Sequence, residues 1–110
     1  MGATTFYNTI KGDNPSKAFK SLVEEALYME GHGGYTGTIA EKHGFKMSRK
    51  PKDVDPNVWV SMLDDFDEDD RQQENYHALK NDFDIYDDKW GPALCIPIKG
   101  GYLFCGWASC

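Results

Sequence analysis

The clearest pattern along the chain is a helical stripe between residues 15 and 30. Apolar residues recur there at i, i+3, i+4, i+7 and i+8, and these positions are Phe19, Leu22, Val23, Ala26 and Leu27. This spacing predicts an amphipathic helix with one apolar face. Asn14 suits the N-cap, and Pro15 suits the first helical turn because its missing N–H needs no partner there. We therefore predict a helix that begins at Pro15 and is closed by Gly31.

Alternation of apolar and polar residues predicts strands in the rest of the first half. Residues 4–10 are rich in β-branched and aromatic side chains, and they predict a first strand. Residues 35–41 alternate more weakly and predict a second strand that lies beside the first. After a turn at His43-Gly44, residues 45–47 predict a short strand that returns antiparallel.

Local signals in the middle of the chain predict helical segments. Asp55-Pro56 repeats the combination of a capping residue and a proline, so residues 57–63 are expected to form a short helix with Trp59, Met62 and Leu63 inward. The β-branched residues of this segment leave a strand as the alternative. The composition of residues 71–80 favours a helix, which we place from about 68 to 80.

Two apolar runs in the last part of the chain predict a β-hairpin. Residues 93–98 and 102–107 flank Lys99-Gly100-Gly101, and two adjacent glycines suit a two-residue turn. With Gly100-Gly101 in the turn, the expected cross-strand pairs are Ile98 with Leu103, Ile96 with Cys105, and Leu94 with Trp107. We expect this apolar face to pack on the stripe of the 15–30 helix and to close the core.

The succession of these elements predicts an α+β fold with the order β-α-β-(β)-α-β-β. We expect a mainly antiparallel sheet of about four to five strands with two helices packed on one face. The chain has 110 residues, which suffice for one hydrophobic core and for a single domain over residues 1–110.

Composition excludes some classes of protein. No apolar run approaches the roughly 18–20 residues of a membrane span, and the first residues do not resemble a secretion signal. We therefore expect a cytoplasmic protein without a membrane partner. The cysteines Cys95, Cys105 and Cys110 lack the paired spacing of a zinc site. We expect free thiols, with Cys95 and Cys105 filling sheet positions as small apolar residues.

The carboxylates Asp65, Asp67 and Asp69 have the spacing that opens a calcium-binding loop. The pattern then fails, because Asp70 stands where that loop needs glycine and Tyr76 stands where it needs glutamate. No segment carries the lysine and hydroxyl residues that end a phosphate-binding loop. The sequence therefore predicts no metal, no cofactor and no catalytic residue.

Charge is distributed unevenly along the chain. The net charge is −6, but residues 53–88 hold thirteen Asp and Glu against two basic residues, a net of −11, and the remainder is +5. The densest part is a run of six carboxylates: Asp64, Asp65, Asp67, Glu68, Asp69 and Asp70. Such a block repels nucleic acid and favours a basic protein partner, or it serves solubility alone.

A second candidate site is the glycine-rich segment 31–38, which follows the predicted helix. Its glycines tolerate positive φ and close approach, and its side chains offer hydroxyl and imidazole groups to a small ligand. The candidate ligand-binding residues are His32, Gly33, Gly34, Tyr35, Thr36, Thr38 and, beyond the turn, His43. Phosphate loops lead from a strand into a helix, whereas this segment leaves a helix, so a structural turn is the alternative.

Two blocks, residues 31–42 (GHGGYTGTIAEK) and 88–93 (DKWGPA), together with the ending 104–109, resemble small uncharacterised proteins of bacteriophages and mobile elements. The resemblance implies a small acidic protein of a kind that often inhibits a host factor. We expect the six carboxylates to imitate a phosphate array, to bind a basic, nucleic-acid-binding host protein, and to inhibit a host nucleic-acid enzyme or an anti-phage defence complex. The alternative is a nucleotide-binding or other small-ligand protein, or a small hydrolase, that uses segment 31–38.

Overall fold

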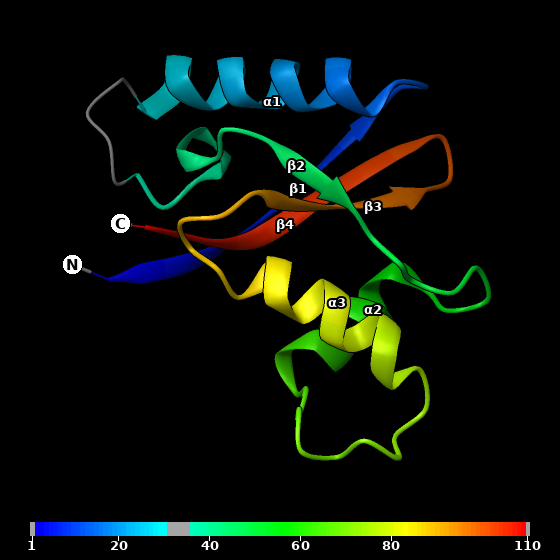
Figure 1. Ribbon diagram of the computed structural model, residues 1–110. Helices are drawn as coiled ribbons and strands as arrows, with labels where there is room; N and C mark the ends of the chain where they lie inside the picture. Colours follow the sequence, from blue (N-terminus) through cyan, green and yellow to red (C-terminus); the bar gives the residue numbers. More distant parts are fainter. Residues whose placement is uncertain (1, 31–35, 110) are drawn as a thin grey trace.

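The computed structural model describes residues 2–30 and 36–109, which form a four-stranded sheet and three α-helices (Figure 1). The elements are β1 (Ala3–Lys11), α1 (Pro15–Glu30), the short 3-10 helix η1 (Ile39–Glu41), β2 (Phe45–Met47), α2 (Pro56–Asp64), α3 (Tyr76–Tyr86), β3 (Ala93–Ile98) and β4 (Gly101–Ser109). The predicted α+β class is confirmed. The predicted order of elements and number of helices differ in detail from this arrangement.

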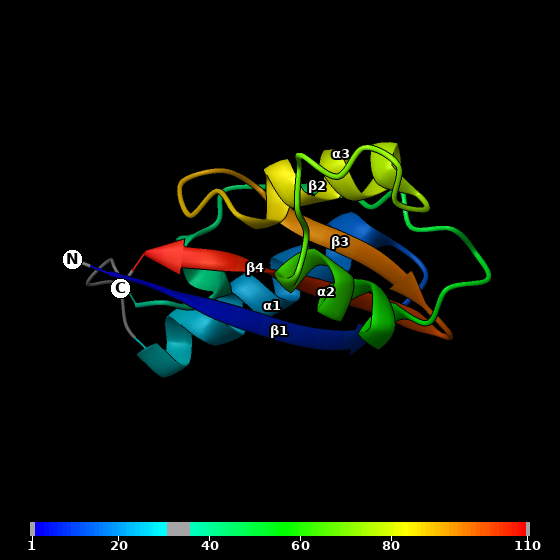
Figure 2. The same cartoon turned by 90° about the horizontal axis from the view of Figure 1, so that it is seen from below.

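The strands lie in the order β1-β4-β3-β2 (Figure 2). β4 pairs antiparallel with β1 on one side and with β3 on the other, whereas β2 pairs parallel with β3. The sheet is therefore mainly antiparallel, as predicted. The short strand over residues 45–47 exists, but its predicted orientation is wrong, because its partner is β3 and not a strand over residues 35–41.

Residues 36–41 form no strand, which corrects the prediction of a second strand over 35–41. Thr38 caps η1 by accepting a hydrogen bond from the N–H two residues further on, at 3.2 Å. Glu41 accepts hydrogen bonds from the N–H and the hydroxyl of Thr36. Such local side-chain bonds offer the backbone an alternative to a sheet and favour a turn.

The first two helices begin where the capping signals predicted. Asn14 Oδ1 accepts a hydrogen bond from the N–H of Lys17 at 3.1 Å, and Asp55 Oδ1 accepts one from the N–H of Asn57 at 2.8 Å. A proline opens each helix. The helix predicted for residues 57–63 is therefore confirmed, and the strand alternative is wrong, since α2 covers this segment.

The third helix begins later than predicted. A helix was expected from about 68 to 80, but α3 runs over Tyr76–Tyr86. Asn75 precedes it in the left-handed conformation, with φ at 63°, which single Asn residues tolerate and a continuing helix does not. Like charges in the acidic run also disfavour a helical turn there, because side chains three and four apart would repel each other.

The helices cover both faces of the sheet, and not one face as predicted (Figure 1). On the α1 face the buried residues are Phe6, Ala18, Leu22, Ile39, Ala93, Cys95, Phe104 and Ala108. On the face of α2 and α3 they are Trp59, Val60, Leu63, Leu79, Tyr86, Leu94, Ile96, Leu103 and Cys105. The predicted apolar face of the hairpin therefore packs on α2 and α3, and its expected contact with the α1 stripe is wrong.

The hairpin has the predicted apolar face but a register shifted by two residues. Ile98 pairs with Gly101, and the pairs that follow are Ile96 with Leu103 and Leu94 with Cys105. Lys99-Gly100 therefore forms the turn, with Gly100 at φ 77°, a conformation that glycine adopts with little strain. Because a shift of two residues returns each side chain to the same face, the predicted face survives the error.

Gly101→Ala is expected to lower the free energy of unfolding by about 1–3 kcal/mol, the usual cost of overpacking. A Cβ atom at this position would lie 2.1 Å from the carbonyl oxygen of Ile10, so β1 would have to move away from β4. Denaturation by urea measures the loss. Gly44→Ala is the control, since no atom lies within 4 Å of its Cβ. Equal losses in both variants would contradict the close approach of β1 at Gly101.

Candidate functional site

The six predicted carboxylates lie together on one exposed segment between α2 and α3. Asp64 is the last residue of α2, and the other five follow in the loop that leads to α3. All six residues are exposed. The loop projects from the sheet on the side opposite to α1 (Figure 1). We refer to residues 64–75 as the acidic loop.

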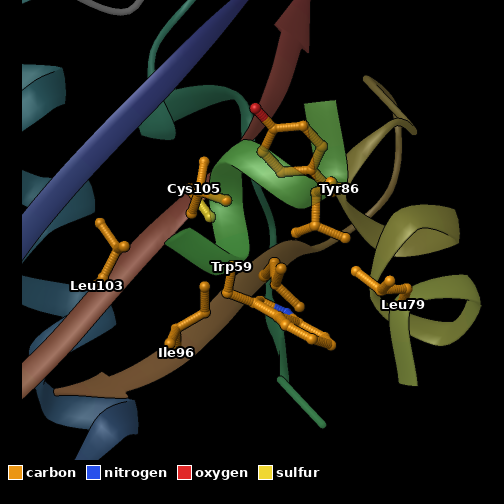
Figure 3. Packing of buried hydrophobic residues seen from close by; sticks show 9 residues of the cluster. Trp59, Leu79, Tyr86, Ile96, Leu103 and Cys105 are labelled. Carbon is orange, nitrogen blue, oxygen red and sulfur yellow. The ribbon is translucent and has the colours of Figure 1, made fainter. Parts of the chain in front are cut away.

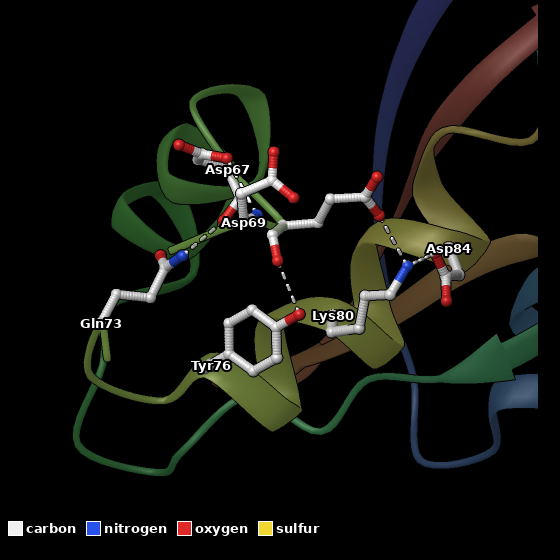
Figure 4. Close-up of polar contacts among 7 residues, drawn as sticks. Asp67, Asp69, Gln73, Tyr76, Lys80 and Asp84 are labelled. Carbon is white, nitrogen blue, oxygen red and sulfur yellow. Dashed lines mark hydrogen bonds and ion pairs between the residues drawn. The ribbon is translucent and has the colours of Figure 1, made fainter. Parts of the chain in front are cut away.

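Hydrogen bonds within the acidic loop hold its backbone in one shape (Figure 4). Asp67 Oδ1 accepts a hydrogen bond from the N–H of Asp69 at 3.0 Å. The Gln73 side-chain amide donates to the carbonyls of Asp67 and Asp70, each at 2.8 Å, and the Tyr76 hydroxyl donates to the carbonyl of Glu68 at 2.8 Å. The side-chain donors, Gln73 and Tyr76, come from the end of the loop and from the start of α3, so the run of carboxylates is tied to that helix.

The carboxylates of the run differ in how far their charge is compensated. Glu68 forms an ion pair with Lys80 at 3.0 Å, and Lys80 is shared with Asp84 at 2.9 Å. Hydrogen bonds to Asp84 and then to Glu68 raise the pKa of Lys80, which keeps its positive charge. The carboxylates of Asp65, Asp69 and Asp70 have no hydrogen bond or ion pair with any residue in the described part of the chain. These three therefore present uncompensated charge to solvent.

Asp64 has a structural contact that the other five lack. Its Oδ1 accepts a hydrogen bond from the Tyr86 hydroxyl at 2.7 Å, and the Tyr7 hydroxyl lies 2.5 Å from that of Tyr86. Because Tyr86 uses its single hydrogen on Asp64, Tyr7 is the donor to Tyr86. Burial, followed by the bonds to Tyr7 and Asp64, raises the pKa of Tyr86. The chain of hydroxyls joins the start of the acidic loop to β1.

A second carboxylate, Asp82, supports the loop from the interior, and sequence reasoning missed it. Asp82 is fully buried and accepts hydrogen bonds from Trp59 Nε1 at 2.8 Å, from the N–H of Arg49 at 3.0 Å, and from the hydroxyl of Ser48. Trp59 belongs to the core cluster drawn in Figure 3. These bonds tie α3 to α2 and to the segment after β2, and they fix the two helices between which the acidic loop runs.

In the glycine-rich segment, the described hydroxyls bond within the turn. Thr36 Oγ1 donates to Glu41 Oε2 at 2.9 Å and lies 2.8 Å from Thr38 Oγ1. These contacts hold the turn that leads into η1. His43 is exposed. The other four candidate ligand residues, His32, Gly33, Gly34 and Tyr35, lie outside the described residues, so the ligand-binding alternative stays a prediction.

One part of this segment borders a groove between β1 and α1. The groove has a volume of about 490 Å³, and its walls include Gly37, Thr38, Ala26, Met29 and residues 5–9. Glu25 is the carboxylate among its lining residues. The groove thus brings Thr38 beside β1, but it brings none of the other described candidate residues there.

The described cysteines are core residues, as the sequence predicted. Cys95 and Cys105 are fully buried in the sheet and form no disulfide. Burial raises the pKa of the Cys95 thiol to about 12 and raises that of the Cys105 thiol further. Since the thiolate is the nucleophilic form, neither thiol has the ionisation of a nucleophile near neutral pH. Cys110 lies outside the described residues.

The described part of the chain holds neither a metal-binding group nor a membrane-spanning helix. Within residues 2–30 and 36–109, no three His, Cys, Asp or Glu side chains form a group that could hold a metal ion. None of the described helices has both the length and the apolar character that a membrane crossing requires.

Comparisons of the chain with protein-family models, with curated proteins and with solved structures gave no match. The resemblance to phage and mobile-element proteins therefore stays a prediction, and the candidate site rests on the contacts described above.

Proposed function

We propose that this protein is a small phage-type binding protein that inhibits a basic, nucleic-acid-binding partner in the host, either a nucleic-acid enzyme or an anti-phage defence complex. The observation that carries the proposal is the acidic loop. Its backbone is held by Gln73 and Tyr76, while the carboxylates of Asp65, Asp69 and Asp70 have no partner among the described residues.

Electrostatics favours a basic groove as the surface that this loop recognises. Nucleic acid presents negative charges at regular spacing along its backbone, and proteins that bind it carry a matching basic surface. A run of uncompensated carboxylates attracts the same surface and steers it into contact. Because the loop is already ordered, its association with a partner loses less conformational entropy than that of a mobile tail.

Neutralising the three uncompensated carboxylates is expected to weaken partner binding without unfolding the protein. In the variant Asp65→Asn/Asp69→Asn/Asp70→Asn, no described hydrogen bond or ion pair of a carboxylate is lost. The wild type, immobilised and exposed to bacterial lysate at low salt, should retain a nucleic-acid-binding protein that duplex DNA displaces. The variant should retain it about tenfold less, since each lost charge contact weakens the complex.

The control variant changes the same number of charges elsewhere. Asp13→Asn/Glu24→Gln/Asp53→Asn removes three exposed carboxylates that lie outside the acidic loop. Its net charge therefore equals that of the loop variant. It should bind like the wild type. A decisive second readout is the activity of the captured protein on nucleic acid, which the wild type should inhibit and the loop variant should not. Equal binding by both variants would refute the role of the loop.

A further inference from the structure

The two edges of the sheet are protected very differently. β2 forms one edge with only three residues, and its Lys46 is exposed. It covers β3 only as far as Cys95, and beyond that point Pro97 has no N–H to offer. Short edge strands, lysines and prolines are devices that keep a sheet edge from pairing with another chain. The β2 edge uses all three.

The opposite edge, β1, has none of these devices along residues 3–10. β1 has nine residues, its pairing with β4 runs from Ala3 to Lys11 without a bulge, and residues 3–10 contain no charge and no proline. Its side chains are mostly threonine, aromatic and β-branched residues, which favour strand pairing. Grooves of about 490 and 530 Å³ border β1 on its two faces. This edge is therefore long, regular and accessible.

The hydrogen-bond pattern shows which backbone groups of β1 point outward. The N–H of Gly12 donates to the carbonyl of Gly100 at 3.1 Å, in line with the register that pairs Lys11 with Gly101. Because hydrogen-bonded and non-bonded pairs alternate in an antiparallel ladder, the even-numbered residues of β1 bond to β4. The N–H and C=O groups of Thr5, Tyr7 and Thr9 therefore point away from the sheet, and no described residue bonds to them.

We propose that β1 pairs antiparallel with β1 of a second copy of this chain, about a two-fold axis at Tyr7, so that two sheets join into one. Tyr7 is the central residue of β1, so this register pairs all nine residues of each strand. It sets Tyr7 opposite Tyr7 and Thr5 opposite Thr9, and these are the residues whose backbone groups are free. Each such pair exchanges two hydrogen bonds.

Charge and symmetry favour a second copy as the occupant of this edge. Lys11 of one strand would lie opposite Ala3 of the other, so no like charges face each other across the new pair. A two-fold pair also closes, because each copy uses its long β1 edge and the β2 edges stay protected. Each copy carries a net charge of −6, so added salt should strengthen the dimer by screening that repulsion. Binding through the acidic loop would respond to salt in the opposite way.

Two double variants test the strand pairing and its register. Thr5→Lys/Thr9→Lys sets lysine opposite lysine twice in the dimer, whereas Thr5→Lys/Thr9→Glu sets lysine opposite glutamate twice. In sedimentation equilibrium, the apparent mass of the wild type should rise with concentration from 12.5 kDa toward twice that value. The lysine pair should raise the dissociation constant about tenfold, since opposed like charges destabilise strand pairs, and the lysine–glutamate variant should dimerise like the wild type.

Amide hydrogen exchange of the wild type supplies a readout that needs no variant. The amides of Thr5, Tyr7 and Thr9 should exchange more slowly as the concentration rises, while exposed amides elsewhere are unchanged. A wild type that stays at 12.5 kDa at the highest concentration, or outward amides that gain no protection, would overturn the proposal. Equal association of the two double variants would do the same. These changes leave the acidic loop intact, so failure here does not bear on the proposed inhibitor function.

Discussion

Asp82→Ala is expected to lower the free energy of unfolding by about 3–5 kcal/mol, a large part of the roughly 5–15 kcal/mol that stabilises a small domain. The substitution removes the acceptor of Trp59 Nε1, of the Arg49 N–H and of the Ser48 hydroxyl. A buried donor without a partner costs about 1–3 kcal/mol. Ser48 and Arg49 are less deeply buried than Trp59, so their donors can form hydrogen bonds to water instead. The total cost therefore stays below that of three unpaired buried donors. Urea denaturation measures the difference.

Asp84→Ala is the matched control for this experiment, because Asp84 lies on the same helix but is exposed. Its ion pair with Lys80 is of the surface kind that contributes at most about 1 kcal/mol. Asp82→Asn should fall between the two, since the amide keeps one acceptor and places an NH₂ group among donors. If Asp82→Ala cost no more than Asp84→Ala, Asp82 would not be the support that the contacts indicate.

Ile96→Ala is expected to cost about 2–5 kcal/mol, the range for truncating a buried isoleucine or leucine. Ile96 is fully buried in the central part of the sheet, in the cluster that includes Trp59 and Leu79 (Figure 3). The substitution leaves a cavity beneath α2 and α3, which the surrounding side chains fill only in part. The midpoint of urea unfolding should fall while the slope of the transition is unchanged.

Cys105→Ala provides the comparison within the same cluster. It removes a single sulfur atom and should cost about 1 kcal/mol, near the centre of the distribution for point substitutions. Partner binding should persist in this variant, because Cys105 is fully buried. A folded Cys105→Ala protein that had lost its function would show that the thiol has a chemical role, and a cost as large as that of Ile96→Ala would show tighter packing than the cluster indicates.

Elements whose signals are local were predictable from the sequence. α1 begins at Pro15 because Asn14 caps it, and α2 begins at Pro56 because Asp55 caps it. Both signals depend on residues within one turn of the helix start. The same holds for the hairpin, where a turn with glycine separates two apolar runs. Its register was missed because either Lys99-Gly100 or Gly100-Gly101 can form the turn.

The layering of the fold was not predicted, although the sequence contained a signal for it. The first four residues of β3 are all buried, and they alternate between the two core clusters. An uninterrupted apolar run is typical of a strand that is covered on both faces, whereas a strand covered on one face alternates. The prediction treated residues 93–98 as a strand with only one buried face, and it therefore placed all helices on one side of the sheet.

In the acidic loop, too, the local feature was predictable, whereas its buried support, Asp82, was not. The exposure of its carboxylates follows from composition and was predicted. Asp82 belongs to the same acidic block and was therefore grouped with the surface, but it lies three residues after Leu79 and four before Tyr86, both buried. A carboxylate on the apolar stripe of a helix marks a buried acceptor. Besides the adjacent Asn81, its donors are Ser48, Arg49 and Trp59, which sequence spacing alone cannot bring together.

The pairing of β1 with β4 also sets the order in which the protein can fold as it is made. Ala3 lies opposite Ser109, and Lys11 lies opposite Gly101, so β1 leaves the ribosome long before its partner β4. Contacts between residues so distant in the chain slow folding, because the intervening segment must be closed into a loop first. Until β4 has been synthesised, β1 and β3 lack their common neighbour. We therefore expect the sheet to form after synthesis of β4, and Phe6 to stay exposed to chaperones until then.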